Sequence, residues 1–141
     1  MSEDFSQDDF VAYVRNAGQA VISTIDAVRG PEAALVSLVV KDNGDICFHS
    51  DPHTRKVANL EADPRIALLI GWSDRTCLQV EGVADILTGA ERKEFVALFE
   101  AKSGHPVADE LKLIRTKPSW VRHCDARTMP AKMTEFDFDR R

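Results

Sequence analysis

The stretch that decides the fold is "SDPHTRKVANLEADPRIALLI", residues 50–70, because its hydrophobic pattern changes from helical to extended within a few residues. Val57 and Leu60 are three residues apart, the spacing of one face of a helix. Pro64 pushes the residue before it out of the helical region, so the helix ends there. The apolar run "RIALLI" that follows has the length of a strand.

Polar side chains gather where this short helix begins. Ser50 or Asp51 is expected to be its N-cap, with Pro52 at the first helical position. A helix N-terminus is an anion site, because its first N–H groups lack partners and the helix dipole is positive there. Two hydroxyls and two cations suited to a phosphate monoester lie close by: Ser50, Thr54, Arg55 and Lys56. The alternative is an ordinary capped surface helix with solvated charges.

Outward from this stretch, the pattern predicts mostly strands. They are expected at residues 20–28, 33–40, 45–50, 65–72, 76–87, 119–126 and 131–138, with helices at 6–18 and 88–102 and a weaker helical stripe at 105–116. Asn43-Gly44 predicts a tight hairpin turn, and Glu81-Gly82 a bulge or a close approach between strands. The charges of "ERKEFVALFEAK", residues 91–102, are expected on a solvated helix face. Neighbouring strands with tight turns pair antiparallel, and closure removes exposed edges. The expected fold class is therefore mainly β (α+β), a small antiparallel barrel with peripheral helices.

Length and charge limit the possible functions. A chain of 141 residues is the size of one domain, so residues 1–141 are taken as a single unit. The net charge of −5 argues against a nucleic-acid surface, which needs clustered Lys and Arg. No apolar run is long enough to span a bilayer, and the start "MSEDFSQDDF" is unlike a secretory leader. A cytoplasmic protein that binds neither nucleic acid nor membrane is expected.

Cysteine and histidine spacing favours neither a disulfide framework nor a metal site. The three cysteines are Cys47, Cys77 and Cys124; with no C-x-x-C spacing, buried free thiols are expected. His49 and His53 lie near Cys47, but no carboxylate or third histidine stands at ligand spacing, so no metal is assigned. His123 and Cys124 are successive strand residues that point to opposite faces, so they cannot form a nucleophile and its base.

A family resemblance adds to these observations. The stretch "GDICFHSDPHTRKVANLEADPRIALLIGW", residues 44–72, with "LQVEGVADIL" after it, resembles the pyridoxamine 5′-phosphate oxidase-like FMN-binding split-barrel family. That family typically shows a strand ending in an aromatic residue or His plus a hydroxyl residue. Ser/Thr-Arg-Lys, a short helix, "NPR" or "DPR" and an apolar strand ending near Trp then follow. The match runs from about Pro31 to Leu87, with looser agreement in "PSWVRH" and "MTEFDF".

The resemblance implies which residues hold the FMN phosphate. In the family an Arg-Lys pair and the hydroxyl at the strand end take this role, which points to Arg55, Lys56 and Ser50. Thr54 occupies the Ser/Thr position, and His49 stands before the hydroxyl residue.

The resemblance also implies contacts with the isoalloxazine ring. The strand "LVSL" resembles the one whose backbone borders the ring, which points to Val36, Ser37 and Leu38. The usual ring-contacting Gln is replaced by Cys77 in "TCLQVEG", and Gln79 lies two residues on, on the same strand face. The family places aromatic residues around the flavin, for which Trp120 is a candidate.

The function implied is that of an FMN-dependent oxidoreductase acting with a small-molecule substrate or electron donor. FMN supplies the redox chemistry itself, so no catalytic acid or base is assigned. The family also implies a homodimer with FMN in the cleft between two barrels. Two alternatives stay open: a flavin-binding protein without turnover, serving stress response or cofactor storage, and the same barrel holding a deazaflavin or haem.

Overall fold

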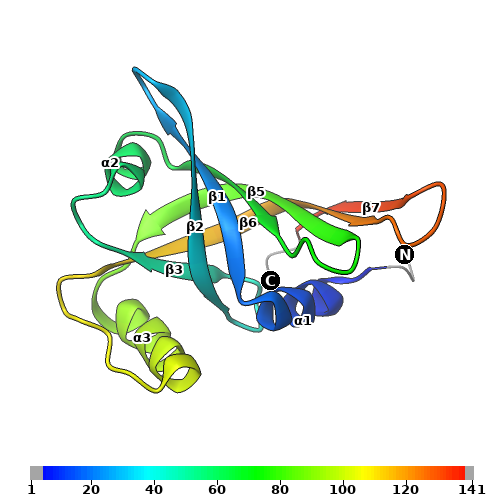
Figure 1. The fold of residues 1–141 in the computed structure, drawn as a ribbon. Coiled ribbons are helices and arrows are strands. Elements are labelled where there is room, and N and C mark those ends of the chain that lie inside the picture. The colour runs from blue at the N-terminus through cyan, green and yellow to red at the C-terminus, as the bar shows by residue number, and fades with distance from the viewer. Residues whose placement is uncertain (1–4, 139–141) are drawn as a thin grey trace.

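Strands dominate the computed structural model, which describes residues 5–138 and within that range contains seven strands and three helices (Figure 1). The strands are β1 (Gln19–Asp26), β2 (Gly30–Val40), β3 (Ile46–Ser50), β4 (Arg65–Ile70), β5 (Thr76–Ile86), β6 (Lys112–Asp125) and β7 (Lys132–Asp137). The helices are α1 (Gln7–Ala17), α2 (Arg55–Ala62) and α3 (Gly89–Ser103). None of these described helices is long and apolar enough to cross a membrane. The first residues of the acidic start lie outside the described range.

The strands form one antiparallel sheet in the order β3-β2-β1-β4-β5-β6-β7. A further antiparallel pairing between β3 and β6 closes the first six strands into a barrel and leaves β7 as an extra strand beside β6. β2 pairs with β3 only from Leu38 to Val40, whereas it pairs with β1 from Gly30 to Ser37. The β1–β2 hairpin therefore leaves the barrel and extends past α2 (Figure 1). The predicted antiparallel split barrel is confirmed.

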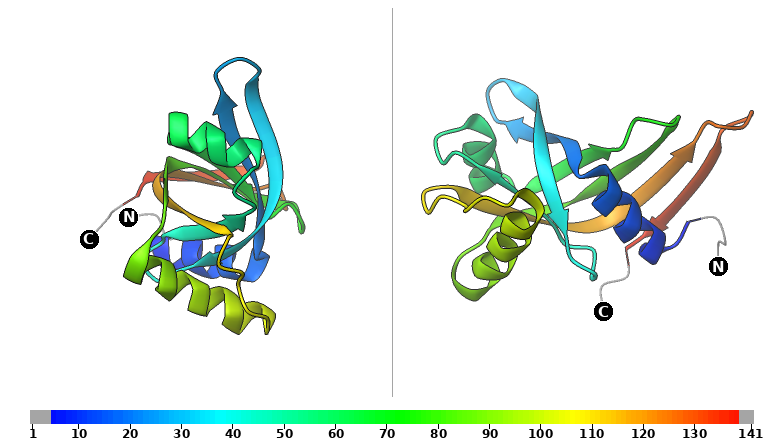
Figure 2. Two further views of the ribbon diagram at one scale, coloured as in Figure 1. Left: turned by 90° about the vertical axis from the view of Figure 1, so that its left-hand side faces the viewer. Right: turned by 60° about the horizontal axis from the view of Figure 1, so that its bottom comes forward.

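Two hydrophobic clusters hold the fold together. The larger fills the barrel and includes Leu38, Phe48 and Ile114, each at most 2 % exposed. The smaller lies outside β3 and β6 and includes Phe95 and Phe99 of α3. α2 and α3 thus cover the outside at one end, while β5, β6 and β7 extend as a ribbon at the other (Figures 1 and 2).

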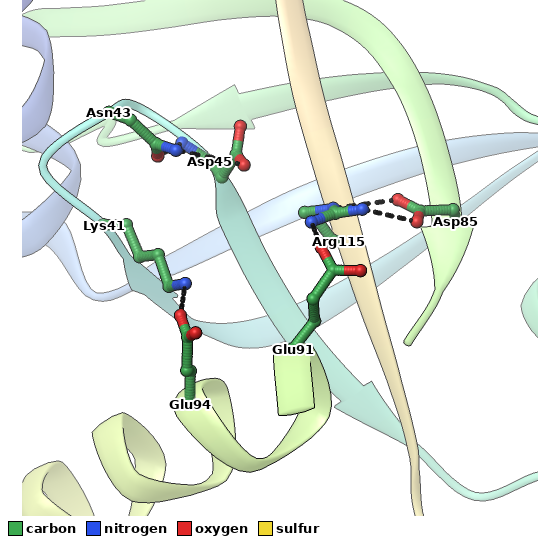
Figure 3. A network of polar contacts seen from close by, with 7 residues as sticks. All are labelled: Lys41, Asn43, Asp45, Asp85, Glu91, Glu94 and Arg115. Carbon is green, nitrogen blue, oxygen red and sulfur yellow. Dashed lines mark hydrogen bonds and ion pairs between the residues drawn. The ribbon is translucent and has the colours of Figure 1, made fainter. Parts of the chain in front are cut away.

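Charged residues fix α3 onto the barrel. The buried Arg115 on β6 donates to both carboxylate oxygens of Asp85 on β5, at 3.1 and 2.7 Å, and to Glu91 on α3 (Figure 3). Lys41, in the β2–β3 hairpin, pairs with Glu94 on the same helix. The prediction that the charges of residues 91–102 lie on a solvated face holds only in part: Glu91 and Glu94 are each 58% exposed, yet both form ion pairs with the barrel. Tertiary ion pairs, which helical periodicity does not reveal, engage much of this helix.

Turn chemistry follows the sequence closely. Ser6 and Asp9 form a reciprocal capping box at the start of α1. The hairpin at Asn43-Gly44 is confirmed, with Gly44 at a φ of 94°, a conformation that favours glycine. At Gly82 the register of β5 against β6 shifts, and a Cβ there would lie 2.3 Å from the carbonyl oxygen of Lys117. The bulge and the close approach are thus both present.

Two predicted helix positions need correction. α2 begins at Arg55 with Thr54 as N-cap, not at Pro52, because Asp51 starts a turn and accepts the N–H of His53 at 2.9 Å. The helical stripe expected at 105–116 is a loop followed by the first residues of β6. In the β3–β6 pairing that closes the barrel, Ile114 lies opposite Phe48. The strand pairing and burial gained there outweigh the weak local preference for a helix.

Candidate functional site

The N-terminus of α2 is open to a ligand, because its N-cap side chain is engaged elsewhere. The Thr54 hydroxyl lies 2.8 Å from that of the buried Ser50 and donates to the Asp51 carbonyl oxygen at 3.2 Å. It makes no capping hydrogen bond to the helix. The first N–H groups of α2 therefore make no hydrogen bond to the N-cap side chain. Such free N–H groups at a helix N-terminus favour the binding of an anion.

The two cations beside this N-terminus differ in their surroundings. Arg55 lies between two carboxylates of the β1–β2 hairpin, 3.3 Å from Asp26 Oδ2 and 3.2 Å from Glu32 Oε2. The N–H groups of Arg29 and Val28, and then Arg55, lower the pKa of Asp26, which keeps it charged. Lys56 takes part in none of the ion pairs recorded for the described residues. One cation is thus largely neutralised and the other is available.

The strand expected to border the flavin ring is only partly available. The Val36 and Leu38 side chains are buried in the barrel, 7 % and 2 % exposed, so only their main chain could meet a ligand. The Leu38 N–H donates to Gly18 O at 2.9 Å, and its carbonyl oxygen accepts from Lys102 at 2.7 Å. Within the described chain, residues 30–37 of β2 pair with β1 alone, which leaves their other backbone edge open.

Ser37 and His49 line one pocket, of about 320 Å³, beside the end of α3. Its wall includes Phe99, which meets the His49 ring edge-on at a centroid distance of 4.9 Å, and also His105. Burial lowers the pKa of His49, so its imidazole is neutral near pH 7. The pocket therefore presents neutral imidazole against an aromatic wall.

Lys102 is the pocket residue that sequence reasoning missed. Its ammonium group donates to Gly18 O at 2.7 Å, Ser37 Oγ at 3.0 Å and Leu38 O at 2.7 Å. Three acceptors match its three protons, and burial lowers its pKa. These partners lie 64 to 84 residues away in sequence, so no local pattern reveals them.

Gln79 and Trp120 line a separate open hollow, of about 580 Å³, on the outer face of β1, β4, β5 and β6. The guanidinium of Arg122 lies 5.2 Å from the Trp120 ring centroid. Cys77 lies on the same face of β5 as Gln79, as predicted, and directly opposite Cys124 of β6. The expectation that all three cysteines are buried holds only for Cys47, because Cys77 and Cys124 are half-buried.

The predicted site residues thus form three groups. The α2 group comprises Ser50, Thr54, Arg55 and Lys56; the α3 pocket holds Ser37 and His49; the outer hollow holds Gln79 and Trp120. His49 contacts α3, whereas Ser50 bonds toward α2, because successive strand residues face opposite sides. Sequence reasoning also missed Asp26 and Glu32, whose contact with Arg55 depends on how the hairpin folds over α2.

Comparison with known proteins gives the family of this fold and site. A family model described as pyridoxamine 5′-phosphate oxidase matches residues 6–125. A pyridoxine/pyridoxamine 5′-phosphate oxidase from Bordetella pertussis is 28% identical over 85 residues, which make up 60% of this chain and 40% of that protein. The chain therefore matches less than half the length of this curated relative.

Solved structures share the fold at low sequence identity. A pyridoxamine 5′-phosphate oxidase-related, FMN binding protein from Nostoc punctiforme has a TM-score of 0.67 and 11% identity, covering 94% of this chain and 91% of that one. A heme binding protein from Mycobacterium smegmatis has a TM-score of 0.73 and 17% identity, covering 94% and 58% respectively. The family model matches residues 6–125, most of this chain, and the chain therefore belongs to the pyridoxamine 5′-phosphate oxidase family.

Proposed function

We propose that residues 1–141 form a single FMN-binding domain that acts as an oxidoreductase on a small-molecule substrate or electron donor. The observation that carries this proposal is the uncapped N-terminus of α2, with the hydroxyls of Ser50 and Thr54 beside it. Lys56, in the first turn of this helix, forms no ion pair with any residue that the structure describes. These donors suit a phosphate monoester, which a flavin mononucleotide has and riboflavin lacks.

The chain's own part in the reaction is to bind and orient the cofactor. Backbone N–H groups of α2 and Lys56 would hold the phosphate, while Arg55 could turn from its carboxylates to share it. The open edge of β2 near Val36 offers main-chain groups to the ring. Bound FMN would supply the electron transfer, so no protein acid or base is required.

We propose further that FMN lies between two copies of the chain, in a homodimer. The outer face of β2, β1 and β4 carries a register row formed by Leu35, Val21 and Leu69. Leu35 is 63% exposed and Leu69 is 38% exposed, so this row is available to a partner. A second copy would cover this apolar area, which monomers rarely expose in large patches. Leu35→Arg should shift the mass in solution from dimer to monomer.

Spectra and matched lysine variants test the cofactor proposal. The purified chain, loaded with FMN, should show flavin absorption and quench flavin fluorescence. Lys56→Ala should weaken FMN affinity about 10-fold, the value of one charge-assisted hydrogen bond of about 1.5 kcal/mol. Lys93→Ala, on an exposed position of α3, is the control and should leave affinity unchanged. Equal effects of both variants would contradict the proposal.

Turnover separates an oxidoreductase from a flavin-binding protein without activity. We expect the bound flavin to be reduced anaerobically by a nicotinamide donor and reoxidised by an acceptor over many cycles. Flavin that binds tightly but is reduced only by dithionite would favour the stress-response or storage alternative.

Haem is the second candidate, favoured by the pocket that His49 and His105 both line. Neutral imidazole is the form that ligates haem iron, and the lowered pKa of His49 keeps it in that form. Adding hemin to the chain should produce a Soret band that His49→Ala abolishes. If FMN binds and hemin gives no such band, the flavin proposal stands alone.

A further inference from the structure

Two cysteines on neighbouring strands face each other on the outer surface of the barrel. Cys77 of β5 and Cys124 of β6 are direct partners in the antiparallel register, and both are half-buried. The third cysteine, Cys47, is fully buried on β3. Of the three thiols, only this opposed pair combines access to solvent with contact between thiols.

The geometry of an antiparallel pair suits a disulfide. Directly opposed residues have Cα atoms about 4.5–5.5 Å apart, within the range of about 4.4–6.8 Å that disulfides span. Their Cβ atoms lie about 4.5–5.5 Å apart, slightly more than a disulfide prefers, so closure draws the strands together by up to about 1 Å. A bond closed under such strain is more readily reduced than a relaxed structural one.

The two thiols already interact. Burial is the main cause that raises the pKa of Cys77, and the neighbouring Cys124 side chain raises it further. Cys47, by contrast, has its pKa raised to about 12 by burial and faces the α3 cluster, so it lacks both access and a thiol partner. The sequence therefore contains its own control cysteine.

We infer that Cys77 and Cys124 form a redox-active dithiol that closes reversibly into a cross-strand disulfide when it meets a small-molecule disulfide. One protein thiolate attacks the oxidant, forming a mixed disulfide and releasing one thiol; the second protein thiolate then attacks that bond and releases the other thiol. Two protein S–H groups become one S–S bond, and the oxidant becomes two thiols, so protons and electrons balance. This chemistry needs no bound flavin and is independent of the proposed function.

The site lies next to the outer hollow. Gln79 and Arg122 form the next pair on the same face, two register rows from the cysteines. On the other side, Cys124 pairs with Met133 of β7. Because Met133 is 56% exposed and peroxides also oxidise methionine, a disulfide is the better oxidant for a test.

The test treats the reduced full-length chain with glutathione disulfide at mildly alkaline pH, alkylates the remaining thiols and maps the peptides by mass spectrometry. We expect an intramolecular Cys77–Cys124 bond, a mass loss of about 2 Da before alkylation, and two of the three thiols gone. Added dithiothreitol should restore both.

Single variants supply the controls. Cys47→Ala should form the bond as the wild type does, whereas Cys77→Ser and Cys124→Ser should each stop at a mixed disulfide with glutathione. Mixed disulfides on both cysteines of the wild type, a bond between two chains, or a bond that includes Cys47 would overturn the inference. Unreactive Cys77 and Cys124 would overturn it equally.

Discussion

Two arginines in different parts of the molecule are each held by two carboxylates but differ in burial. Each guanidinium lies between two carboxylates: Asp26 and Glu32 for Arg55, Asp85 and Glu91 for Arg115. The Arg115 side chain is 10% exposed, whereas that of Arg55 is 45% exposed. A buried guanidinium that loses its partners remains as an unpaired buried charge, which costs several kcal/mol, whereas an exposed one exchanges its partners for water or a ligand at little cost. We therefore assign Arg115 to stability and propose Arg55 for ligand binding.

The largest effect is expected at the buried arginine. Arg115→Met removes the guanidinium whose hydrogen bonds to Asp85 and Glu91 join β6 to β5 and α3. The free energy of unfolding should fall by about 2–3 kcal/mol in urea denaturation. Arg122→Met is the control, because Arg122 pairs with Glu135 at a more exposed position and should cost about 1 kcal/mol or less. Equal losses in the two variants would show that burial does not set the difference.

At the exposed arginine, the effect should appear in binding instead. Arg55→Gln should change the free energy of unfolding by no more than about 1 kcal/mol. It should weaken FMN affinity at least about 10-fold, because one charged hydrogen bond to phosphate is lost. Fluorescence titration measures the affinity and urea denaturation the stability. A large loss of stability with unchanged affinity would make Arg55 another structural arginine.

Removing a competing carboxylate sharpens the comparison in the opposite direction. In the wild type, the Asn59 side chain donates to Glu32 Oε1 at 3.1 Å, and the glutamine of Glu32→Gln keeps an oxygen that can accept this hydrogen bond. The substitution removes only the negative charge beside Arg55. FMN affinity should rise roughly two- to fivefold, the equivalent of about 0.5–1 kcal/mol. Glu135→Gln, on a strand far from α2 in sequence, should have no effect. An unchanged or lower affinity for Glu32→Gln would contradict the competition.

The smallest expected effect is a pH dependence from two histidines. Burial is the main cause that lowers the pKa of both His49 and His123 below the ordinary value of 6.5. The unfolded chain then binds protons that the folded chain does not, so stability falls as pH drops through 6.5 toward the folded pKa values. His123→Phe, which can keep the stacking on Phe5, should reduce this slope in urea denaturation at several pH values. A stability that rises on acidification over this range would show the opposite sign.

Local chemistry explains why much of the barrel could be predicted. The Ser6–Asp9 capping box, the Asn43-Gly44 turn and the Gly82 bulge each depend on a few adjacent residues. The alternation of β5 also placed Cys77 and Gln79 correctly on one face. Such features are stabilised within a turn or a strand pair, so their sequence is sufficient to indicate them.

Contacts between distant segments explain what could not be predicted. Residues 112–116 have a weak helical pattern but become part of β6, because pairing with β3 closes the barrel. Lys102 was expected in solvent and is exposed, yet its ammonium group donates to the carbonyl oxygens of Gly18 and Leu38. The carboxylates around Arg55 likewise come from a hairpin more than 20 residues upstream. The cations of the candidate site were identified from the sequence, but their degree of neutralisation requires the fold.

The central claim, that the open N-terminus of α2 holds a flavin phosphate, is tested most directly by comparing FMN with riboflavin on the wild-type chain. Both ligands share the ring and the ribityl chain, so their difference in affinity isolates the phosphate. Two charge-assisted hydrogen bonds of about 1.5 kcal/mol each predict FMN to bind at least about 100-fold more tightly in a fluorescence or calorimetric titration. Equal affinity for FMN and riboflavin would contradict the account.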